Sequence, residues 1–260
     1  MGKNKLKKFA EMETFHNVFQ CGARDMVDGS PVVAMRGKWH AEYFHNDNPI
    51  VLELGCGRGE YTVGLAARYP NKNYIGIDIK GARMWAGAKQ AELAGMKNVA
   101  FLRTNIEMLT HFFVPNEVAE IWITFPDPQM KKATKRLTST FFMQRYAQLL
   151  QPNGLIHLKT DSPFLYTYTQ AMLIENNFPL LVDTADLYAA EATSDIDEAR
   201  SLQTHYEHQW LDRGLTIKYL RWELSHCDNL IEPEIDIEKD TYRSYGRNYN
   251  TTDSNNKSNN

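Results

Sequence analysis

The sequence predicts an α/β protein built on a doubly wound, mostly parallel sheet with an antiparallel last strand, and three observations support this fold class. From residue 50 onward, short apolar or β-branched runs alternate with amphipathic stretches of helix length. Residues typical of turns, above all Pro, Asn and Gly, separate the runs from the stretches. The last run, at 215–224, alternates between apolar and polar residues along its length. Strand–helix alternation of this kind predicts a sheet covered by helices on both faces.

The predicted elements follow one another without an internal repeat. The expected strands are 50–54, 74–78, 99–103, 118–124, 154–160, 178–184 and 215–224. The expected helices are 59–69, 82–95, 138–150, 163–176 and 199–212. Ligands bind such sheets at the carboxyl ends of the strands, so a site is expected in the residues that directly follow each strand.

Three regions are expected along the 260 residues: a flexible basic arm at 1–35, an α/β domain at 36–226, and at 227–260 a tail that is acidic and then low in complexity, as is typical of disorder. The formal net charge is −3, but residues 223–260 hold eight of the 32 acidic residues and only four of the 29 basic ones. The rest of the chain is therefore almost neutral. Its local basic clusters permit a nucleic-acid partner.

The three cysteines, Cys21, Cys56 and Cys227, are far apart and form no Cys-x-x-Cys pair. We therefore expect neither a metal site nor a disulfide framework, and the composition suits a reducing compartment. The sequence shows no apolar run of bilayer length and no signal-peptide core at its start. The expectation is a cytoplasmic protein without a membrane or metal partner, with its oligomeric state left open between monomer and homodimer.

A glycine loop follows the first predicted strand, in the motif Leu-Glu-Leu-Gly-Cys-Gly-Arg-Gly at 52–59. Gly55 and Gly57 allow the backbone to approach a ligand closely, although an ordinary tight turn also uses such residues. The Gly-x-Gly-x-Gly spacing differs from the Gly-x-Gly-x-x-Gly of dinucleotide enzymes. Glu53, two residues before the first glycine, would repel a pyrophosphate but suits the cationic methionyl end of S-adenosylmethionine. The loop therefore indicates this cofactor.

Polar residues follow the next strands as well. Asp78 ends the second predicted strand, where a carboxylate can accept bonds from both ribose hydroxyls; it could instead begin the next helix as its N-cap. Asn105 follows the third strand and could meet the adenine edge or simply form a turn. Asp161 ends the fifth strand, where it too could cap a helix.

Asp127 stands at the end of the fourth predicted strand, in the motif Phe-Pro-Asp-Pro at 125–128. The flanking prolines stiffen its backbone, and the strand end faces the expected cofactor cleft, which favours a functional carboxylate over a simple turn. Basic residues follow directly and are candidates for phosphate contacts: Lys131, Lys132, Lys135 and Arg136.

From about Trp39 to Leu224 the sequence resembles the bacterial tRNA (guanine-N7)-methyltransferase family. The resemblance rests on the glycine loop, Tyr-Ile-Gly-Ile-Asp at 74–78, Phe-Pro-Asp-Pro at 125–128, Lys-Arg-Leu at 135–137, Lys-Thr-Asp at 159–161 and Thr-His-Tyr-Glu at 204–207. The glycine loop marks methyltransferases in general. The Phe-Pro-Asp-Pro strand end, followed by basic residues and by Thr-His-Tyr-Glu, is far more specific.

The resemblance implies a Rossmann-like methyltransferase domain that methylates N7 of a guanine in tRNA, at position 46 of the variable loop. With the glycine loop it gives the expected contacts to S-adenosylmethionine as Glu53, Gly55, Gly57, Asp78, Asn105 and Asp127. It also implies that Asp127 is the catalytic residue. The expected substrate site is Lys131, Asp161, Thr204, Tyr206 and Glu207, and the expected contacts to RNA phosphate are Lys132, Lys135 and Arg136.

Three alternatives share part of this evidence. A methyltransferase acting on another RNA, a protein or a small molecule would share the cofactor residues and differ only in 127–136 and 204–207. A tRNA-binding module without turnover is disfavoured by the intact carboxylates of Glu53 and Asp127. An NAD-dependent dehydrogenase is disfavoured by the glycine spacing and by Glu53.

Overall fold

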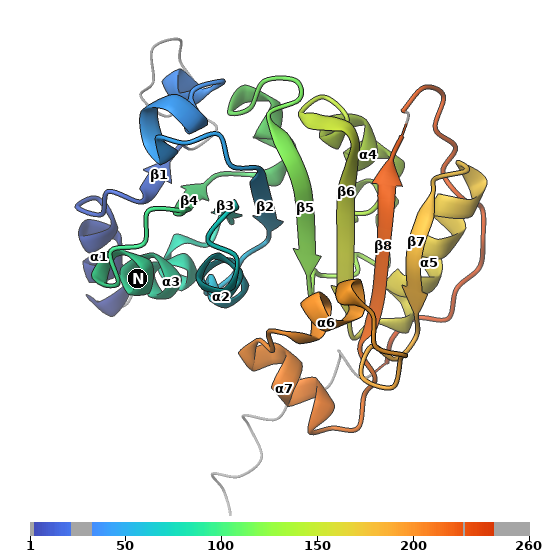
Figure 1. The fold of residues 1–260 in the computed structure, drawn as a ribbon. Coiled ribbons are helices and arrows are strands. Elements are labelled where there is room, and N and C mark those ends of the chain that lie inside the picture. Colours follow the sequence, from blue (N-terminus) through green and yellow to red (C-terminus); the bar gives the residue numbers. More distant parts are fainter. Residues whose placement is uncertain (1–2, 22–32, 226, 242–260) are drawn as a thin grey trace, which may run out of the picture.

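The computed structural model describes residues 3–21, 33–225 and 227–241, and these build one eight-stranded sheet with helices on both faces (Figure 1). The strand order is β1-β4-β3-β2-β5-β6-β8-β7. The strand β8 runs opposite to the other strands, so the predicted fold class, mostly parallel with an antiparallel last strand, is confirmed. The strands are β1 (Val18–Gln20), β2 (Ile50–Leu54), β3 (Asn73–Ile77), β4 (Val99–Arg103), β5 (Val118–Thr124), β6 (Leu150–Thr160), β7 (Leu180–Thr184) and β8 (Lys218–Leu224).

The α-helices are α1 (Lys3–Met12), α2 (Glu60–Arg68), α3 (Gly81–Leu93), α4 (Thr140–Tyr146), α5 (Pro163–Glu175), α6 (Ser194–Arg200) and α7 (His205–Leu211). The helices α2 to α5 connect the strands as predicted, and the segment between β7 and β8 differs from the prediction. The single helix expected at 199–212 is wrong. The chain breaks between α6 and α7 because Thr204 and Glu207 form a capping box that starts a new helix.

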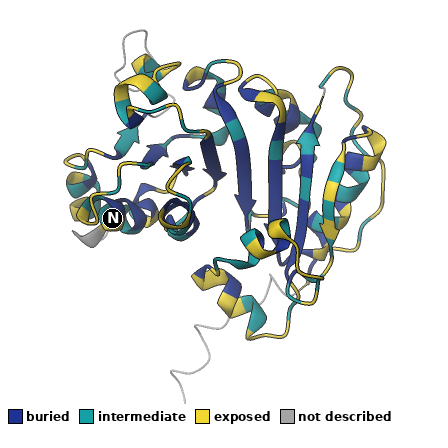
Figure 2. Cartoon of the chain, in the orientation of Figure 1, coloured by how far each residue is buried: buried dark blue, intermediate teal, exposed yellow. Residues whose placement is uncertain are grey.

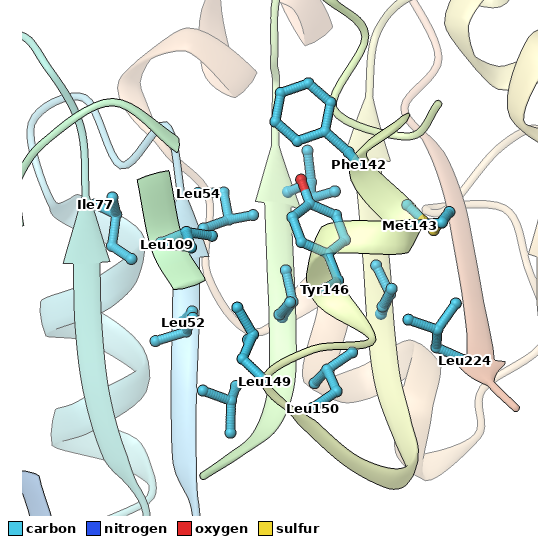
Figure 3. Close-up of a cluster of buried hydrophobic side chains, with 14 of the residues drawn as sticks. Leu52, Leu54, Ile77, Leu109, Phe142, Met143, Tyr146, Leu149, Leu150 and Leu224 are labelled. Carbon is cyan, nitrogen blue, oxygen red and sulfur yellow. The ribbon is translucent and has the colours of Figure 1, made fainter. Parts of the chain in front are cut away.

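The core consists of two apolar layers, one on each face of the sheet. Alternate residues of a strand point to opposite faces, so Leu52 joins the layer under α4 and α5 while Val51 joins the layer under α2 and α3. The central strands are buried almost throughout (Figure 2). Figure 3 shows part of the first layer, including Leu54 of β2 with Phe142 and Met143 of α4.

The N-terminal region differs from the flexible arm that the sequence analysis expects at 1–35. Its helix α1 packs against α3, and β1 adds a parallel strand at the edge of the sheet beside β4. Met12 is 1% exposed within the layer of α2 and α3. This apolar anchor places α1 on the domain. Residues 22–32 lie outside the described residues.

The C-terminal residues 227–241, which we call the strap, also differ from the expected disordered tail. The strap has no regular secondary structure and runs alongside α5, from the C-terminal end of that helix to its N-terminal end. At one end, Asn176 exchanges two hydrogen bonds with the backbone of Ile231, at 2.7 and 2.8 Å. At the other end, Asp240 is 8% exposed and accepts a backbone N–H from the first turn of α5 at 3.1 Å. Residues 242–260 lie outside the described residues.

Among the helices that the structure describes, none combines the length and the apolar character needed to cross a membrane.

Candidate active site

The loop after β2 forms one wall of a cleft at the carboxyl edge of the sheet. Gly55 and Gly57 have φ angles of 76° and 54°, in the left-handed region that favours glycine. A Cβ atom on Gly55 would have no neighbour within 4 Å, so the backbone there faces open space. The cleft has a volume of about 520 Å³. Backbone of this kind can lie directly against a ligand.

Glu53 lies beneath the glycine loop, with its side chain at the floor of this cleft. The residue is 4% exposed. Thr62 donates its backbone N–H to one carboxylate oxygen at 2.8 Å, and the Thr124 hydroxyl donates to the other at 2.8 Å. Burial raises the pKa of Glu53 to about 7, although these hydrogen bonds oppose the rise. A cation bound in the cleft would favour the charged carboxylate.

Asp78 joins the glycine loop to a second cleft. Its carboxylate accepts the backbone N–H of Gly57 at 2.9 Å and that of Lys80 at 2.7 Å. Asp78 and Ile79 line both the first cleft and the second, which has a volume of about 630 Å³ and contains Asn105 in its wall. The predicted cofactor residues therefore lie in two adjoining clefts. They are Glu53, Gly55, Gly57, Asp78 and Asp127 in the first, with Asn105 in the second.

Asp127 is exposed at the rim of the first cleft, on a strained loop. Its carboxylate accepts the backbone N–H of Gln129 at 3.0 Å. Phe125 and Gln129 on either side have φ angles of 49° and 46°, which costs non-glycine residues about 1–3 kcal/mol each. Such strain persists only where the surroundings impose it. Phe125 is held by a backbone hydrogen bond to Lys159 at 2.8 Å.

Arg136 holds the other end of this loop, at Gln129 and Met130. Its guanidinium donates to the backbone oxygens of Gln129 and Met130 at 3.3 Å and lies 4.3 Å from the centre of the Tyr168 ring. The residue is only 9% exposed. The predicted phosphate contact of Arg136 is therefore corrected: the guanidinium is committed to the loop that carries Asp127.

Three of the predicted cations remain exposed beside the second cleft. Lys131, Lys132 and Lys135 line it, and Lys135 lines the first cleft too. Lys135 also forms an ion pair with Glu107 at 2.8 Å. The arrangement places positive charge at the outer border of the site, where an anionic substrate would meet it first.

The segment 194–211, which comprises α6 and α7, is anchored to the sheet by a buried lysine. Lys159 of β6 is 0% exposed, and its Nζ atom donates to the backbone oxygens of Ala199 at 2.7 Å and Leu202 at 2.9 Å. The same atom forms an ion pair with Glu207 at 2.8 Å. Burial lowers the pKa of Lys159, and Glu207 opposes this shift. One cation thus binds both helices and their connection.

This anchor decides which of the predicted substrate residues reach the site. Thr204 and Tyr206 line the first cleft. Glu207 and Asp161 are 0% exposed and line neither cleft. The structure therefore does not bring Glu207 and Asp161 to the surface of the site. Glu207 instead positions α7 through Lys159 and through the hydroxyl of Tyr188 at 2.6 Å.

Several residues of the site were not predicted from the sequence. Thr62 and Thr124 hold Glu53 but carry no motif of their own. Arg58 and Arg83 also line the first cleft. Lys159 did leave a signal, because a lysine inside an otherwise apolar strand must be buried with a partner. Its partner is too distant in the chain to be identified without the structure.

The chain is an S-adenosylmethionine-dependent methyltransferase. The order of its strands, the glycine loop after β2 and the carboxylates at successive strand ends together define this class of protein. More particularly, the chain belongs to the tRNA (guanine-N(7)-)-methyltransferase family. A family model described as "Putative methyltransferase" matches residues 47–220.

Relatives similar to this chain carry the name tRNA (guanine-N(7)-)-methyltransferase. One from Bacteroides fragilis is 59% identical over 95% of this chain and 96% of its own length. One from Porphyromonas gingivalis is 58% identical over 91% of this chain and 96% of its own length. Among solved structures, a 16S rRNA methyltransferase matches with a TM-score of 0.54 and 16% identity, over 69% of this chain and 89% of that one. This last likeness concerns the fold alone.

Proposed function

We propose that this protein transfers the methyl group of S-adenosylmethionine to N7 of a guanine in tRNA. The names of the relatives support the reaction. The observation that carries it is the pair of adjoining clefts, one floored by Glu53 and the glycine loop and the other bordered by exposed lysines. The loop of Asp127 lies where a base and the cofactor would meet.

The residues of the two clefts fit S-adenosylmethionine. The open face of Gly55 leaves room for the methionyl group, whose positive charge Glu53 would balance. Asp78 would accept the ribose hydroxyls, and Asn105 in the second cleft would meet the adenine edge. When bound, the cofactor supplies an electrophilic methyl group on a sulfonium.

Methylation of guanine N7 requires little chemistry from the protein itself. The N7 atom of guanine has a free lone pair and no proton, so no general base is needed there. The protein must orient N7 and exclude water. Positive charge develops on the purine during transfer, and Asp127 at the cleft rim would stabilise it. Lys131 would contact phosphate or a base edge, with Lys132 and Lys135 on further phosphates.

Thr204 and Tyr206 would complete the substrate side of the first cleft. Glu207 and Asp161 serve the substrate from below the surface, as positioning residues for the segment and the strand end that they occupy. The target implied by the family resemblance is guanosine 46 of the variable loop. A tRNA substrate also fits a cytoplasmic protein, and we expect it to act as a monomer or a homodimer.

Methyl transfer to unmodified tRNA tests this function. Purified protein is incubated with labelled S-adenosylmethionine and tRNA, and the product is cleaved with aniline after borohydride reduction, which cuts at 7-methylguanosine. We expect a single cut in the variable loop. Cofactor binding without transfer of label to any tRNA would contradict the proposal.

A further inference from the structure

Helix α1 lies with its N-terminal half at the carboxyl edge of the sheet, the edge that holds the clefts. Two contacts of Phe9 fix this level. A Cβ on Gly81, at the start of α3, would lie 2.7 Å from the Phe9 ring. The guanidinium of Arg103, the last residue of β4, lies 4.6 Å from the centre of the same ring. Both the start of α3 and the end of β4 belong to the carboxyl edge.

The direction of α1 follows from contacts further along both helices. Glu11 accepts hydrogen bonds from Trp85 at 2.8 Å and from Lys89 at 2.6 Å, deeper along α3. Asn17, beyond the end of α1, donates to the backbone of Ala88 at 2.9 Å. Later residues thus meet α3 further from the cleft edge. Since a helix rises about 1.5 Å per residue, Lys5 lies roughly 6 Å before Phe9, toward and past that edge.

The exposed positive charge of α1 lies in its first half, the half nearest the cleft edge. Lys5 and Lys7 in its first half are exposed, whereas Glu11 in its second half is already bonded to α3. At the same edge, Lys80 and Arg83 are exposed and line the first cleft. The α1 lysines therefore extend the cationic border of the site outward across this face.

The strap carries the opposite charge. It runs along α5, on the face opposite α1, and four of its acidic residues are exposed: Asp228, Glu234, Asp236 and Glu238. A polyanion approaching the carboxyl edge is therefore attracted to the α1 side and repelled from the strap side.

We propose that Lys5 and Lys7, which lie outside the two clefts, bind the phosphate backbone of tRNA together with Lys80 and Arg83 at the border of the first cleft. The inference rests on the proposed function, because it takes tRNA as the polyanion. A tRNA is much larger than the clefts, so the strand on either side of an inserted guanine must cross the surface around them. Contacts to phosphate position a nucleic acid without reading its sequence, which is the role assigned here to α1.

The test compares two double variants that remove the same charge. Lys5→Gln/Lys7→Gln changes the proposed surface, and Gln retains the helix propensity of Lys. Lys38→Gln/Lys97→Gln is the matched control, because both lysines are exposed and lie at the amino edge, before β2 and before β4. Binding of unmodified tRNA is measured between about 50 and 200 mM salt. Binding of S-adenosylmethionine and thermal melting are measured on the same proteins.

We expect the α1 variant to lose about 1.5 from the slope of log affinity against log salt and to bind tRNA roughly five- to tenfold more weakly. Its cofactor affinity and melting temperature should match those of the control. Equal slopes in the α1 variant and the control would overturn the proposal. The proposal would also be overturned if the wild-type protein methylates tRNA and neither double variant differs from it in the salt slope of tRNA binding. Wild-type protein that binds no tRNA at low salt would instead refute the proposed function, and the present inference with it.

Discussion

The cofactor half and the substrate half of the site are held in different ways. In the cofactor half, β2 to β4, two of the bonds that shape the cleft join near neighbours: Thr62 bonds Glu53 nine residues away, and Gly57 bonds Asp78 21 residues away. The bond from Thr124 to Glu53 spans 71 residues. In the substrate half, the backbone of His205 bonds the Glu60 carboxylate 145 residues away. The cofactor half is thus shaped mainly by local turns, whereas the segment 194–211 in the substrate half depends on side chains that join distant segments.

This difference predicts where distant substitutions act. A change outside the cofactor cleft should leave the glycine loop intact, because its shape depends on short-range backbone geometry. A change at an anchor such as Lys159 should alter the substrate half without touching any ligand. The following experiments test this division, from the largest expected effect to the smallest.

Loss of the buried anchor should have the largest effect. Lys159→Met leaves the Glu207 carboxylate buried without its cation, which typically destabilises a protein by about 3–5 kcal/mol. Urea denaturation measures the loss, and hydrogen exchange should rise most strongly in the segment 194–211. The double variant Lys159→Met/Glu207→Leu should recover most of the stability, because no charge remains buried. A single variant as stable as wild type, with unchanged exchange, would contradict the anchor.

Replacement of the rim carboxylate should separate turnover from cofactor binding. Asp127→Asn keeps an oxygen that can accept the Gln129 N–H but removes the charge, so kcat should fall on the order of 10²–10³. The dissociation constant for S-adenosylmethionine should change by less than about threefold. Asp47→Asn, an exposed site at the amino edge, is the control. A rise in the dissociation constant for S-adenosylmethionine by the same factor as the fall in kcat would make Asp127 a cofactor-binding residue.

The pKa of Glu53 should make cofactor affinity depend on pH. Burial raises this pKa to about 7, so the carboxyl ionises as pH rises from 6 to 8, and affinity for a cationic ligand should rise with a midpoint near 7. Glu53→Gln should remove the pH dependence and weaken binding about tenfold at pH 8. Isothermal titration with S-adenosylmethionine measures both.

Glu117→Gln provides the control for this titration. Glu117 is also buried with a raised pKa, but it bonds Val114 and Gly37 and lines neither cleft. The pH dependence should survive in this variant. The raised pKa of Glu53 has a second consequence: between about pH 4.5 and 7 the folded protein keeps a proton that the unfolded chain releases, so this group's contribution to stability falls as pH rises.

A single surface lysine should give the smallest effect. Lys131→Gln removes one exposed cation from the second cleft, so the KM for tRNA should rise about threefold and the salt slope should fall by about 0.9. Lys239→Gln, an exposed lysine of the acidic strap, should change neither. Steady-state kinetics at several salt concentrations measure the KM and the salt slope of both variants. An equal change in both variants would indicate a general effect of net charge.

Much of the parallel sheet could be predicted because its strands are apolar runs buried on both faces. The bounds of β2, β4 and β5 agree with those runs. β1 escaped prediction because three half-buried residues give no periodic signal. The break between α6 and α7 escaped it because the apolar pattern continues across a capping box.

By itself, the sequence determined most of the sheet, the glycine loop and the strand ends that carry Glu53, Asp78 and Asp127. These depend on local patterns: apolar runs, glycines with positive φ and the turn that follows each strand. Only the tertiary structure decided that Arg136 and Glu207 are buried supports while Thr204 and Tyr206 reach the cleft. The physical reason is that a charged side chain can be buried only beside a compensating partner, and folding alone brings that partner near.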